Sequence, residues 1–151
     1  SLYIAARNGH VEVVKLVAMH DESLVTARDE YDNSVLDAAA RWGNANIIRL
    51  LLEKGAPPNA DDGGAISSAC SVGAHAAVRL LVHAGSNVDT TNTAGWTPLH
   101  KAIDKDKLDI ARFLLKRGAN ANANDNALNT GAPLHLACSK ASPAAVRLLV
   151  D

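Results

Sequence analysis

Apolar residues recur along this chain at the spacing of short helices rather than strands. In five places an apolar residue is followed three and four positions later by small or apolar residues, a spacing that puts all three on one helix face. The leading residues of these five windows are separated by 34, 30, 33 and 35 positions. They are Leu2, Leu36, Ile66, Leu99 and Leu134. A period of about 33 residues predicts a solenoid of stacked repeats.

A second apolar stripe follows each window. In the fourth copy it consists of Ile110, Ala111, Phe113 and Leu114, and the other copies carry equivalent sets. Two short helices cannot bury their apolar faces alone, so each pair must stack on the next one. We therefore expect an all-α fold, a solenoid of stacked helix-turn-helix units.

The segment 91–119 is the most complete copy and carries its own start and stop signals. Thr97 offers a side-chain oxygen that can cap the first helix, and Pro98 follows where a missing N–H costs nothing. Gly118 can adopt the left-handed conformation that ends the second helix.

The third copy is weaker than the fourth. It has Gly64 and Ala65 in place of Thr97 and Pro98, and two serines follow in its first helix. The sequence therefore predicts faster hydrogen exchange in residues 63–73 than in residues 98–106. Just before this copy, Pro57 and Pro58 remove two backbone donors, so we expect an irregular loop there.

Several motifs resemble the ankyrin repeat. They are Gly95-Trp96-Thr97-Pro98-Leu99-His100, the pair Gly9-His10 and the segment from Gly118 to Ala123. The resemblance covers essentially the whole chain and implies repeats at about 1–28, 29–58, 59–91, 92–124 and 125–151. It also implies an L-shaped unit, in which β-hairpin or loop fingers project from the helix pair, and a concave palm that binds other proteins.

The terminal repeats differ from the family pattern. The first begins at Ser1, where the family has Pro, and the fifth ends at Asp151 within its second helix. We expect the chain to be a piece of a longer array, with Leu148, Leu149 and Val150 partly uncovered.

Composition narrows the possible partners. The chain has 151 residues, 48% of them hydrophobic, and a formal net charge of -1, which provides no bulk attraction to nucleic acid. No apolar run approaches the length of a membrane span, and no signal peptide is recognisable. We expect a monomer in the cytoplasm; a nuclear protein or an effector delivered into a host cell would have a similar sequence.

The two cysteines, Cys70 and Cys138, occupy equivalent positions two repeats apart. Helices stack at roughly 8–10 Å, which puts the two sulfurs about 20 Å apart, beyond disulfide reach. We expect both to be free and buried.

The sequence offers no convincing catalytic, cofactor or metal site. His100 and His135 lie one repeat apart, at roughly 10 Å, too far to share a metal ion. The segment from Asn120 to Gly131 lacks the Gly and the Glu of a calcium loop, and no lysine-containing phosphate loop follows Asp61. We therefore predict a protein that is not an enzyme and holds no cofactor or metal.

One basic residue recurs at the same place in all five second helices. The five are Lys15, Arg49, Arg79, Arg112 and Arg147. These side chains could bind an anionic surface. The ankyrin pattern itself favours Lys at this position, however, so a basic residue there needs no functional explanation. Because the net charge is near zero, we interpret the row as an ordinary solvated face.

We predict a non-catalytic scaffold or adaptor that binds a partner protein or peptide through its palm and fingers. The alternative is a regulatory or substrate-docking arm of a larger enzyme or channel. A small-molecule or lipid site would need an apolar pocket, which tightly stacked Ala-rich helices seldom leave.

Two sets of residues are predicted to bind the partner. The residue two places after each leading apolar residue points about 200° away from it, so it should line the palm floor. These residues are Ile4, Ala38, Ser68, Lys101 and Leu136. For Ile4 and Leu136, packing against neighbouring helices is an alternative with at least equal support. The second set lies in the fingers and at the ends of first helices, and consists of Tyr31, Asn33, Arg41, Trp42, Trp96, Asp104 and Lys105.

Trp42 is the stronger candidate of the two tryptophans, because its position holds unrelated residues in the other copies, whereas the ankyrin pattern often has Trp for packing at the position of Trp96. A half-buried Trp beside a solvated acidic loop is the alternative interpretation. The neighbouring acidic residues favour a partner with basic residues and a salt-sensitive association. These are Asp29, Glu30, Asp32 and Asp37.

Overall fold

The fourth repeat shows how the local sequence sets the limits of a helix pair. The N–H of His100 donates to Oγ1 of Thr97 at 3.4 Å, and Nδ1 of His100 accepts from the N–H of Thr97 at 3.1 Å. This reciprocal capping box, with Pro98 as the first helical residue, begins α7 (Pro98–Asp104). The next helix, α8 (Leu108–Lys116), is followed by Gly118 at φ +87°. The start and stop signals predicted for this repeat are confirmed.

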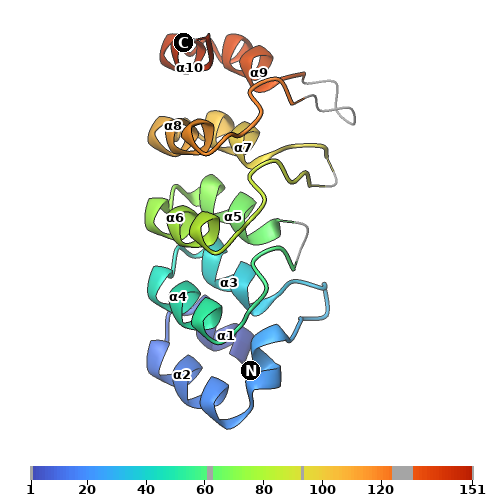
Figure 1. Cartoon of the computed structure of the whole chain (residues 1–151), viewed down its shortest axis with the longest axis vertical. Coiled ribbons are helices and arrows are strands. Elements are labelled where there is room, and N and C mark those ends of the chain that lie inside the picture. Colours follow the sequence, from blue (N-terminus) through green and yellow to red (C-terminus); the bar gives the residue numbers. More distant parts are fainter. Residues whose placement is uncertain (1, 61–62, 93, 124–130, 151) are drawn as a thin grey trace.

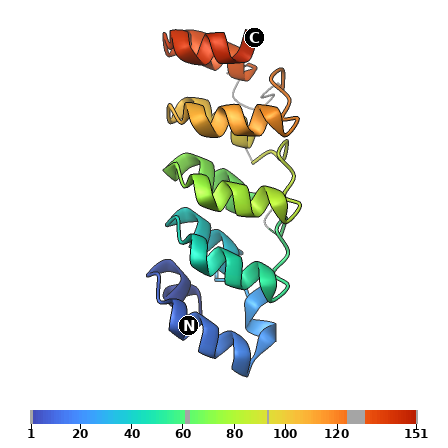
Figure 2. The same cartoon turned by 60° about the vertical axis from the view of Figure 1, so that its left-hand side comes forward.

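The computed structural model describes residues 2–60, 63–92, 94–123 and 131–150. Within them every regular element is a helix, apart from one isolated β-bridge, so the all-α prediction is confirmed. Figures 1 and 2 show helix pairs stacked one above another along a single axis. The first helices of the remaining pairs are α1 (Leu2–Arg7), α3 (Val35–Arg41), α5 (Gly64–Val72) and α9 (Pro133–Ser139). The second helices are α2 (Val11–His20), α4 (Ala45–Glu53), α6 (His75–His83) and α10 (Pro143–Val150).

The first and second helices form two layers. In Figure 1 the second helices lie on the left, and the loops between repeats project to the right, beyond the first helices. The core between the layers contains large side chains such as Ile47, Ile48 and Leu51, which are fully buried. Ala39 and Ala69 are also fully buried, and these small residues let α3 pack closely against α5. The apolar periodicity therefore identified the buried faces of the inner repeats, whereas Val13 and Leu16 of α2 and Cys138 of α9 are exposed.

The fingers contain less regular structure than the resemblance implies. Arg28 and Ser34 form an isolated antiparallel bridge in the second repeat, and no longer strand occurs in the described residues. Pro58, Asn59 and Ala60 are in a turn, as expected for the loop after Pro57. A 3₁₀ helix that the sequence analysis did not predict, η1 (Glu22–Thr26), begins where the side chain of Asp21 accepts from the Ser23 N–H.

The first helix of the third repeat lacks a side-chain cap, as its sequence suggested. Gly63 precedes α5 in the left-handed conformation, at φ +83°, and forms no side-chain cap hydrogen bond. A Cβ atom there would lie 1.9 Å from Cγ2 of Thr90. Because Thr90 of the next finger approaches so closely, only glycine fits at this position. Within α5, the hydroxyl of Ser71 donates to the carbonyl of Ser67 at 3.0 Å. This helix is therefore held by its neighbours rather than by its own cap.

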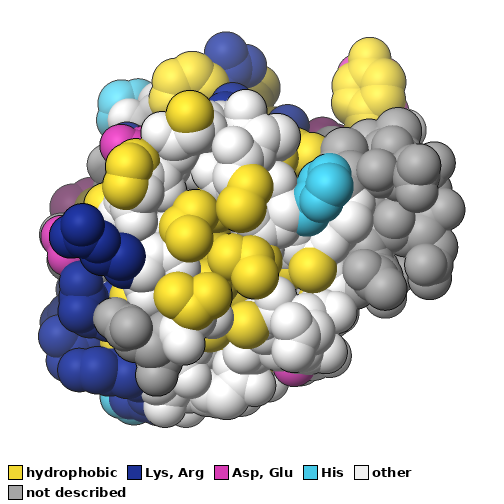
Figure 3. All heavy atoms as spheres, turned by 90° about the horizontal axis from the view of Figure 1, so that it is seen from above, with side chains coloured by type: hydrophobic (Ala, Val, Ile, Leu, Met, Phe, Trp, Pro, Cys, Tyr) yellow, Lys and Arg dark blue, Asp and Glu magenta, His cyan; other side chains and the backbone are white. Residues whose placement is uncertain are grey.

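The upper end of the array, formed by α9 and α10, presents a cluster of hydrophobic side chains (Figure 3). Leu148 and Leu149 are half-buried and Val150 is 63% exposed, as predicted. Cys70 is buried, but Cys138 is exposed, so the prediction of two buried cysteines is wrong for Cys138. The reason is positional: Cys70 lies on a helix with neighbours on both sides, whereas within the described chain no further repeat covers α9.

Burial raises the pKa of the Cys70 thiol to about 12. Both cysteines are free, as expected. None of the helices in the described residues is both long enough and apolar enough to cross a membrane.

Candidate functional site

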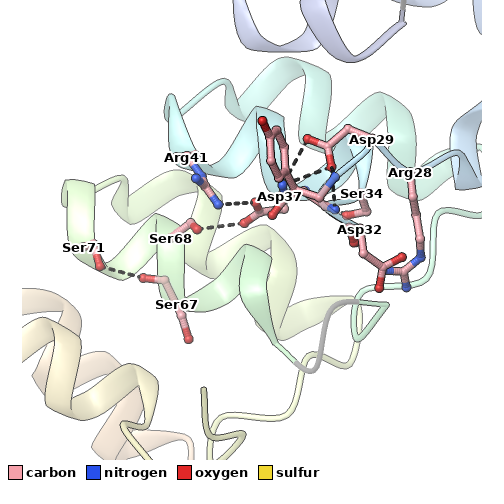
Figure 4. Close-up of polar contacts among 11 residues, drawn as sticks. Arg28, Asp29, Asp32, Ser34, Asp37, Arg41, Ser67, Ser68 and Ser71 are labelled. Atoms are coloured by element: carbon pink, nitrogen blue, oxygen red, sulfur yellow. Dashed lines mark hydrogen bonds and ion pairs between the residues drawn. The ribbon is translucent and has the colours of Figure 1, made fainter. Parts of the chain in front are cut away.

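The buried carboxylate of Asp37 is the centre of a polar network on the palm, the face of the array formed by the first helices and the fingers (Figure 4). Ser34 caps α3 by accepting from the N–H of Asp37 at 3.0 Å, and this fixes Asp37 in the first turn. Oδ2 of Asp37 accepts from the guanidinium of Arg41 at 2.8 Å, and Oδ1 accepts from the Ser68 hydroxyl at 2.7 Å. Asp37 is 2% exposed, so the network links the second and third repeats through a desolvated carboxylate.

The finger of the second repeat is shaped by Asp29. One carboxylate oxygen accepts from the N–H groups of Tyr31 and Asn33 at 2.9 Å, and the Asn33 side chain donates to both oxygens. Burial acts to raise the pKa of Asp29, but these hydrogen bonds outweigh it and lower the pKa. Asn33 therefore serves to fold the finger, while Tyr31 remains 77% exposed near its tip.

Trp96 and His100 form a stacked pair at the base of the next finger. Their ring centroids lie 6.1 Å apart, and Nζ of Lys101 lies 4.8 Å from the centroid of the Trp96 ring. Nδ1 of His100 accepts from Thr97, so Nε2 carries the proton and donates to the carbonyl of Gly131 at 3.1 Å. His100 thus links the fourth and fifth repeats, in agreement with a structural rather than a metal-binding role.

Asp104 links the same two repeats on the palm side. Its carboxylate lies 3.2 Å from Nζ of Lys105 and 3.1 Å from Nζ of Lys140. Burial acts to raise the pKa of Asp104, but the two lysines outweigh it and lower the pKa. The Asp104 side chain is 20% exposed, so much of this predicted contact residue is used within the fold.

Trp42 follows α3 as its C-cap residue and is 58% exposed. The guanidinium of Arg7 lies 5.4 Å from the centroid of its ring. This cation–π contact holds the indole at the surface without burying it. Arg7 was not among the predicted site residues, although it occupies the same place in the first repeat as Arg41 in the second.

Four predicted site residues meet at a single hollow of about 440 Å³ on the palm. They are Asn33, Arg41, Ser68 and Lys101. Asp37, Ser67, Ser71, Val72 and Asn92 also line this hollow, together with Gly64. The other predicted residues do not line it. Tyr31 and Trp42 are exposed elsewhere, and Trp96, Asp104 and Lys105 lie toward the fourth and fifth repeats.

The predicted palm floor is only partly correct. Ser68 and Lys101 are half-buried and line the hollow, and Ile4 is 55% exposed. Ala38 is instead buried, at 1% exposure, and Leu136, at 7% exposure, follows the alternative of packing against neighbouring helices. Adjacent first helices approach closely enough to cover a side chain that points only partly away from the core.

The four acidic residues expected around Trp42 do not form one acidic surface. Asp37 is buried and bonded to Arg41, Asp29 is bonded within its own loop, and Asp32 lies 3.2 Å from Arg28. Glu30 is exposed. The sequence could not distinguish these cases, because each depends on where the carboxylate points in the folded loop.

The described residues contain no group of three or more His, Cys, Asp or Glu side chains placed to hold a metal ion. His135 is exposed while His100 is buried. Asp61, Asp62 and residues 124–130, which include most of the segment compared with a calcium loop, lie outside the described residues.

Comparison with known proteins agrees with the repeat architecture. A family model described as ankyrin repeats (3 copies) matches residues 1–62 and again residues 66–151. A putative ankyrin repeat protein of fowlpox virus is 31% identical over 99% of this chain and 46% of its own length. The p105 subunit of mouse nuclear factor NF-kappa-B is 34% identical over 80% of the chain and 13% of its own length.

A Caenorhabditis elegans homologue of the transient receptor potential cation channel subfamily A member 1 is 27% identical over 99% of the chain. The chain covers 12% of that protein, and it spans less than half the length of each of these three relatives. The family match extends over nearly every residue and coincides with the observed helix pairs. The chain therefore belongs to the ankyrin-repeat family.

Proposed function

We propose that this array binds a partner protein or peptide through its palm and fingers and catalyses no reaction. Ankyrin repeats are generally protein-interaction modules, and the chain belongs to that family. The proposal rests mainly on one observation: hydrogen bonds fix the polar side chains of the palm floor, whereas the indole of Trp42 is exposed beside them. Asp37 ties the second and third repeats together, while Trp42 is presented at the edge of the same helix.

Preorganisation is the physical advantage of this arrangement. The floor of the hollow already has its hydrogen bonds in place, so binding does not require Arg41 or Ser68 to be ordered first. Trp, Tyr and Arg contribute most to interface energies, because they offer large amphipathic surfaces at a modest entropy cost. Trp42 and Tyr31 together supply the aromatic part of such a contact.

The charge of the fingers supports a partner with basic residues. The four segments between helix pairs (27–34, 56–63, 86–96 and 119–132) contain seven Asp or Glu residues and one Arg. Several of these carboxylates are used within the fold, but their net charge still attracts cations at long range. Association should therefore weaken as salt concentration rises.

The experiment is capture of partners from native lysate with the array as bait, followed by mass spectrometry. A true palm partner is retained by the wild-type array and lost from the Trp42→Ala variant. If substitution of Trp42 and of the residues that line the hollow leaves capture of the partner unchanged, the palm is not the binding site. Light scattering of the purified array tests the accompanying expectation of a monomer, and cell fractionation tests that of a cytoplasmic protein.

A second candidate function is a regulatory or docking arm of a larger enzyme or channel. It is favoured by the lengths of the relatives, since the similar segment forms 12% of the channel homologue and 13% of the p105 subunit. The sequence that flanks this array in its own full-length protein decides the matter. A catalytic or channel domain there would support this second function.

A further inference from the structure

Charge is distributed unevenly over the two layers of this molecule. The helices α4, α6, α8 and α10, with the capping residues of the first three, contain eight Lys or Arg residues and two Asp or Glu residues. The segments between helix pairs contain seven acidic residues and one basic residue. The net charge of -1 thus results from two regions of opposite charge that nearly cancel. A net charge near zero therefore does not exclude an anionic partner for the basic second helices.

Lys and Arg side chains gather along the left side of the array when it is viewed from above (Figure 3). This is the side on which Figure 1 places the second helices. Arg49, Arg79, Arg112 and Arg147 are all exposed there, one on each of four successive second helices. We call these four residues the arginine row. Neighbouring members are separated by roughly 10 Å, the usual distance between packed helices.

Internal contacts use other cations of this face but not the arginine row. Lys54 lies 3.6 Å from Glu22, and Arg117 contacts Nε2 of His83 at 3.0 Å and the ring of Phe113 at 5.0 Å. In the described part of the chain, the four side chains of the row form no hydrogen bond or ion pair. Their guanidinium donors are therefore available to an external anion.

We propose that the arginine row is a second docking surface, separate from the palm, that binds an extended acidic segment of a partner protein. An arginine fork matches a carboxylate bidentately, which favours Asp and Glu side chains over a diffuse anionic field. A polypeptide in the extended polyproline II conformation advances about 3.1 Å per residue with three residues per turn, so every third side chain lies on the same face and meets the next member of a row spaced at roughly 10 Å. The occupant is thus an extended chain with Asp or Glu at about every third position.

Two other anionic partners fit this face less well. Single-stranded nucleic acid is held by stacking on exposed aromatic rings, whereas Phe113, the one aromatic residue on α4, α6, α8 and α10 apart from histidines, is half-buried. Anionic membranes are bound by basic surfaces that also insert apolar side chains. On α4, α6, α8 and α10 the one large exposed apolar residue is Val150, at the end of α10; Val13, Leu16 and Met19 are exposed on α2, outside the row.

The test uses the whole chain and a labelled peptide of about fifteen residues with Glu at every third position, the rest being Pro and Ser, a composition that favours the polyproline II conformation. Fluorescence anisotropy is measured at about 50 mM and about 200 mM salt. Arg79→Gln/Arg112→Gln removes the two central members of the row, and Gln keeps the helix propensity close to that of Arg. As the control, Arg7→Gln/Lys105→Gln removes the same charge from exposed positions at the ends of first helices, away from the second helices.

We expect peptide binding that weakens with salt and falls by about tenfold or more in the arginine-row variant, with a change of at most about twofold in the control variant. Trp42→Ala should leave this binding intact, which separates the surface from the proposed palm site. Absence of peptide binding at low salt, or equal losses in both charge variants, would overturn the proposal. So would tighter binding of a single-stranded oligonucleotide or of phosphatidylserine vesicles that the arginine variant abolishes.

Discussion

The hydroxyl of Ser68 donates to Oδ1 of Asp37 across 2.7 Å, from the first helix of the third repeat to the first helix of the second. Asp37 is almost fully buried and also accepts from Arg41, so a single carboxylate holds two other side chains. In a linear array each repeat is stabilised by its neighbours, and such a bond belongs to the interface rather than to either unit.

Removal of this carboxylate should weaken coupling between the two repeats. We expect Asp37→Ala to lower the free energy of unfolding by about 2 kcal/mol, and Ser68→Ala by about 1 kcal/mol. Because the two groups share a bond, the double variant should lose less than the sum of these values. Urea denaturation of the four proteins checks this, with Asp37→Asn as the control of similar size. Strictly additive losses would show that the bond contributes nothing to the interface.

The two tryptophans should respond differently to truncation. Trp42 is 58% exposed, so Trp42→Ala should leave thermal stability nearly unchanged while reducing partner affinity by about 2 kcal/mol or more. Trp96 packs against the core and stacks on His100, so Trp96→Ala should lower stability by about 2 kcal/mol. Calorimetric melting measures the stabilities, and titration with the captured partner measures the affinities. A fold-stability loss in Trp42→Ala as large as that in Trp96→Ala would assign Trp42 to the framework.

Local stability should differ between the third and fourth repeats. α5 begins without a side-chain cap, whereas α7 begins with a complete capping box. We expect amide hydrogens in residues 63–73 to exchange faster than those in residues 98–106. Hydrogen exchange followed by mass spectrometry of matching peptides provides the comparison. Equal protection of the two segments would mean that neighbouring repeats, rather than caps, set local stability.

Acid should destabilise the array through carboxylates whose pKa values are lowered in the folded state. The pKa of Asp104 lies below its ordinary value of 3.8, because Lys140 and Lys105 outweigh the effect of burial. A lowered folded pKa contributes stability that is fully present above the unfolded value and is lost as pH falls through the folded value. The free energy of unfolding should therefore decline between about pH 5 and about pH 2.

Asp104→Asn and Lys140→Gln should each flatten this decline, since each removes one side of the interaction. Denaturant titrations at several pH values test the effect. If the free energy of unfolding depends on pH in both variants as it does in the wild type, Asp104 does not contribute to the acid sensitivity.

The two cysteines should differ in reactivity. Cys138 is exposed, whereas Cys70 is buried with its pKa raised to about 12, which suppresses the reactive thiolate. A thiol reagent should label Cys138 in the native protein and reach Cys70 only after unfolding. Cys138→Ser should abolish native labelling. Rapid labelling of Cys70 in that variant would show that the third repeat opens readily.

The sequence determined the repeat architecture, because the forces that define each helix pair are local. The apolar spacing around Leu99, the cap at Thr97 and the stop at Gly118 all act within a few residues, so they can be recognised without coordinates. Repetition of these signals over the chain also predicted stacking, since a single pair cannot bury its own apolar face.

The tertiary structure alone decided which polar residues are used within the fold and which face outward. Asp37 and Glu30 are both acidic residues of the second repeat, but Asp37 is buried in a network and Glu30 is exposed. Ala38 and Cys138 differ from expectation for the same reason: burial depends on the repeat that packs alongside. Contacts between repeats join residues about 31 positions apart, as in the bond from Ser68 to Asp37, and no local pattern specifies their geometry.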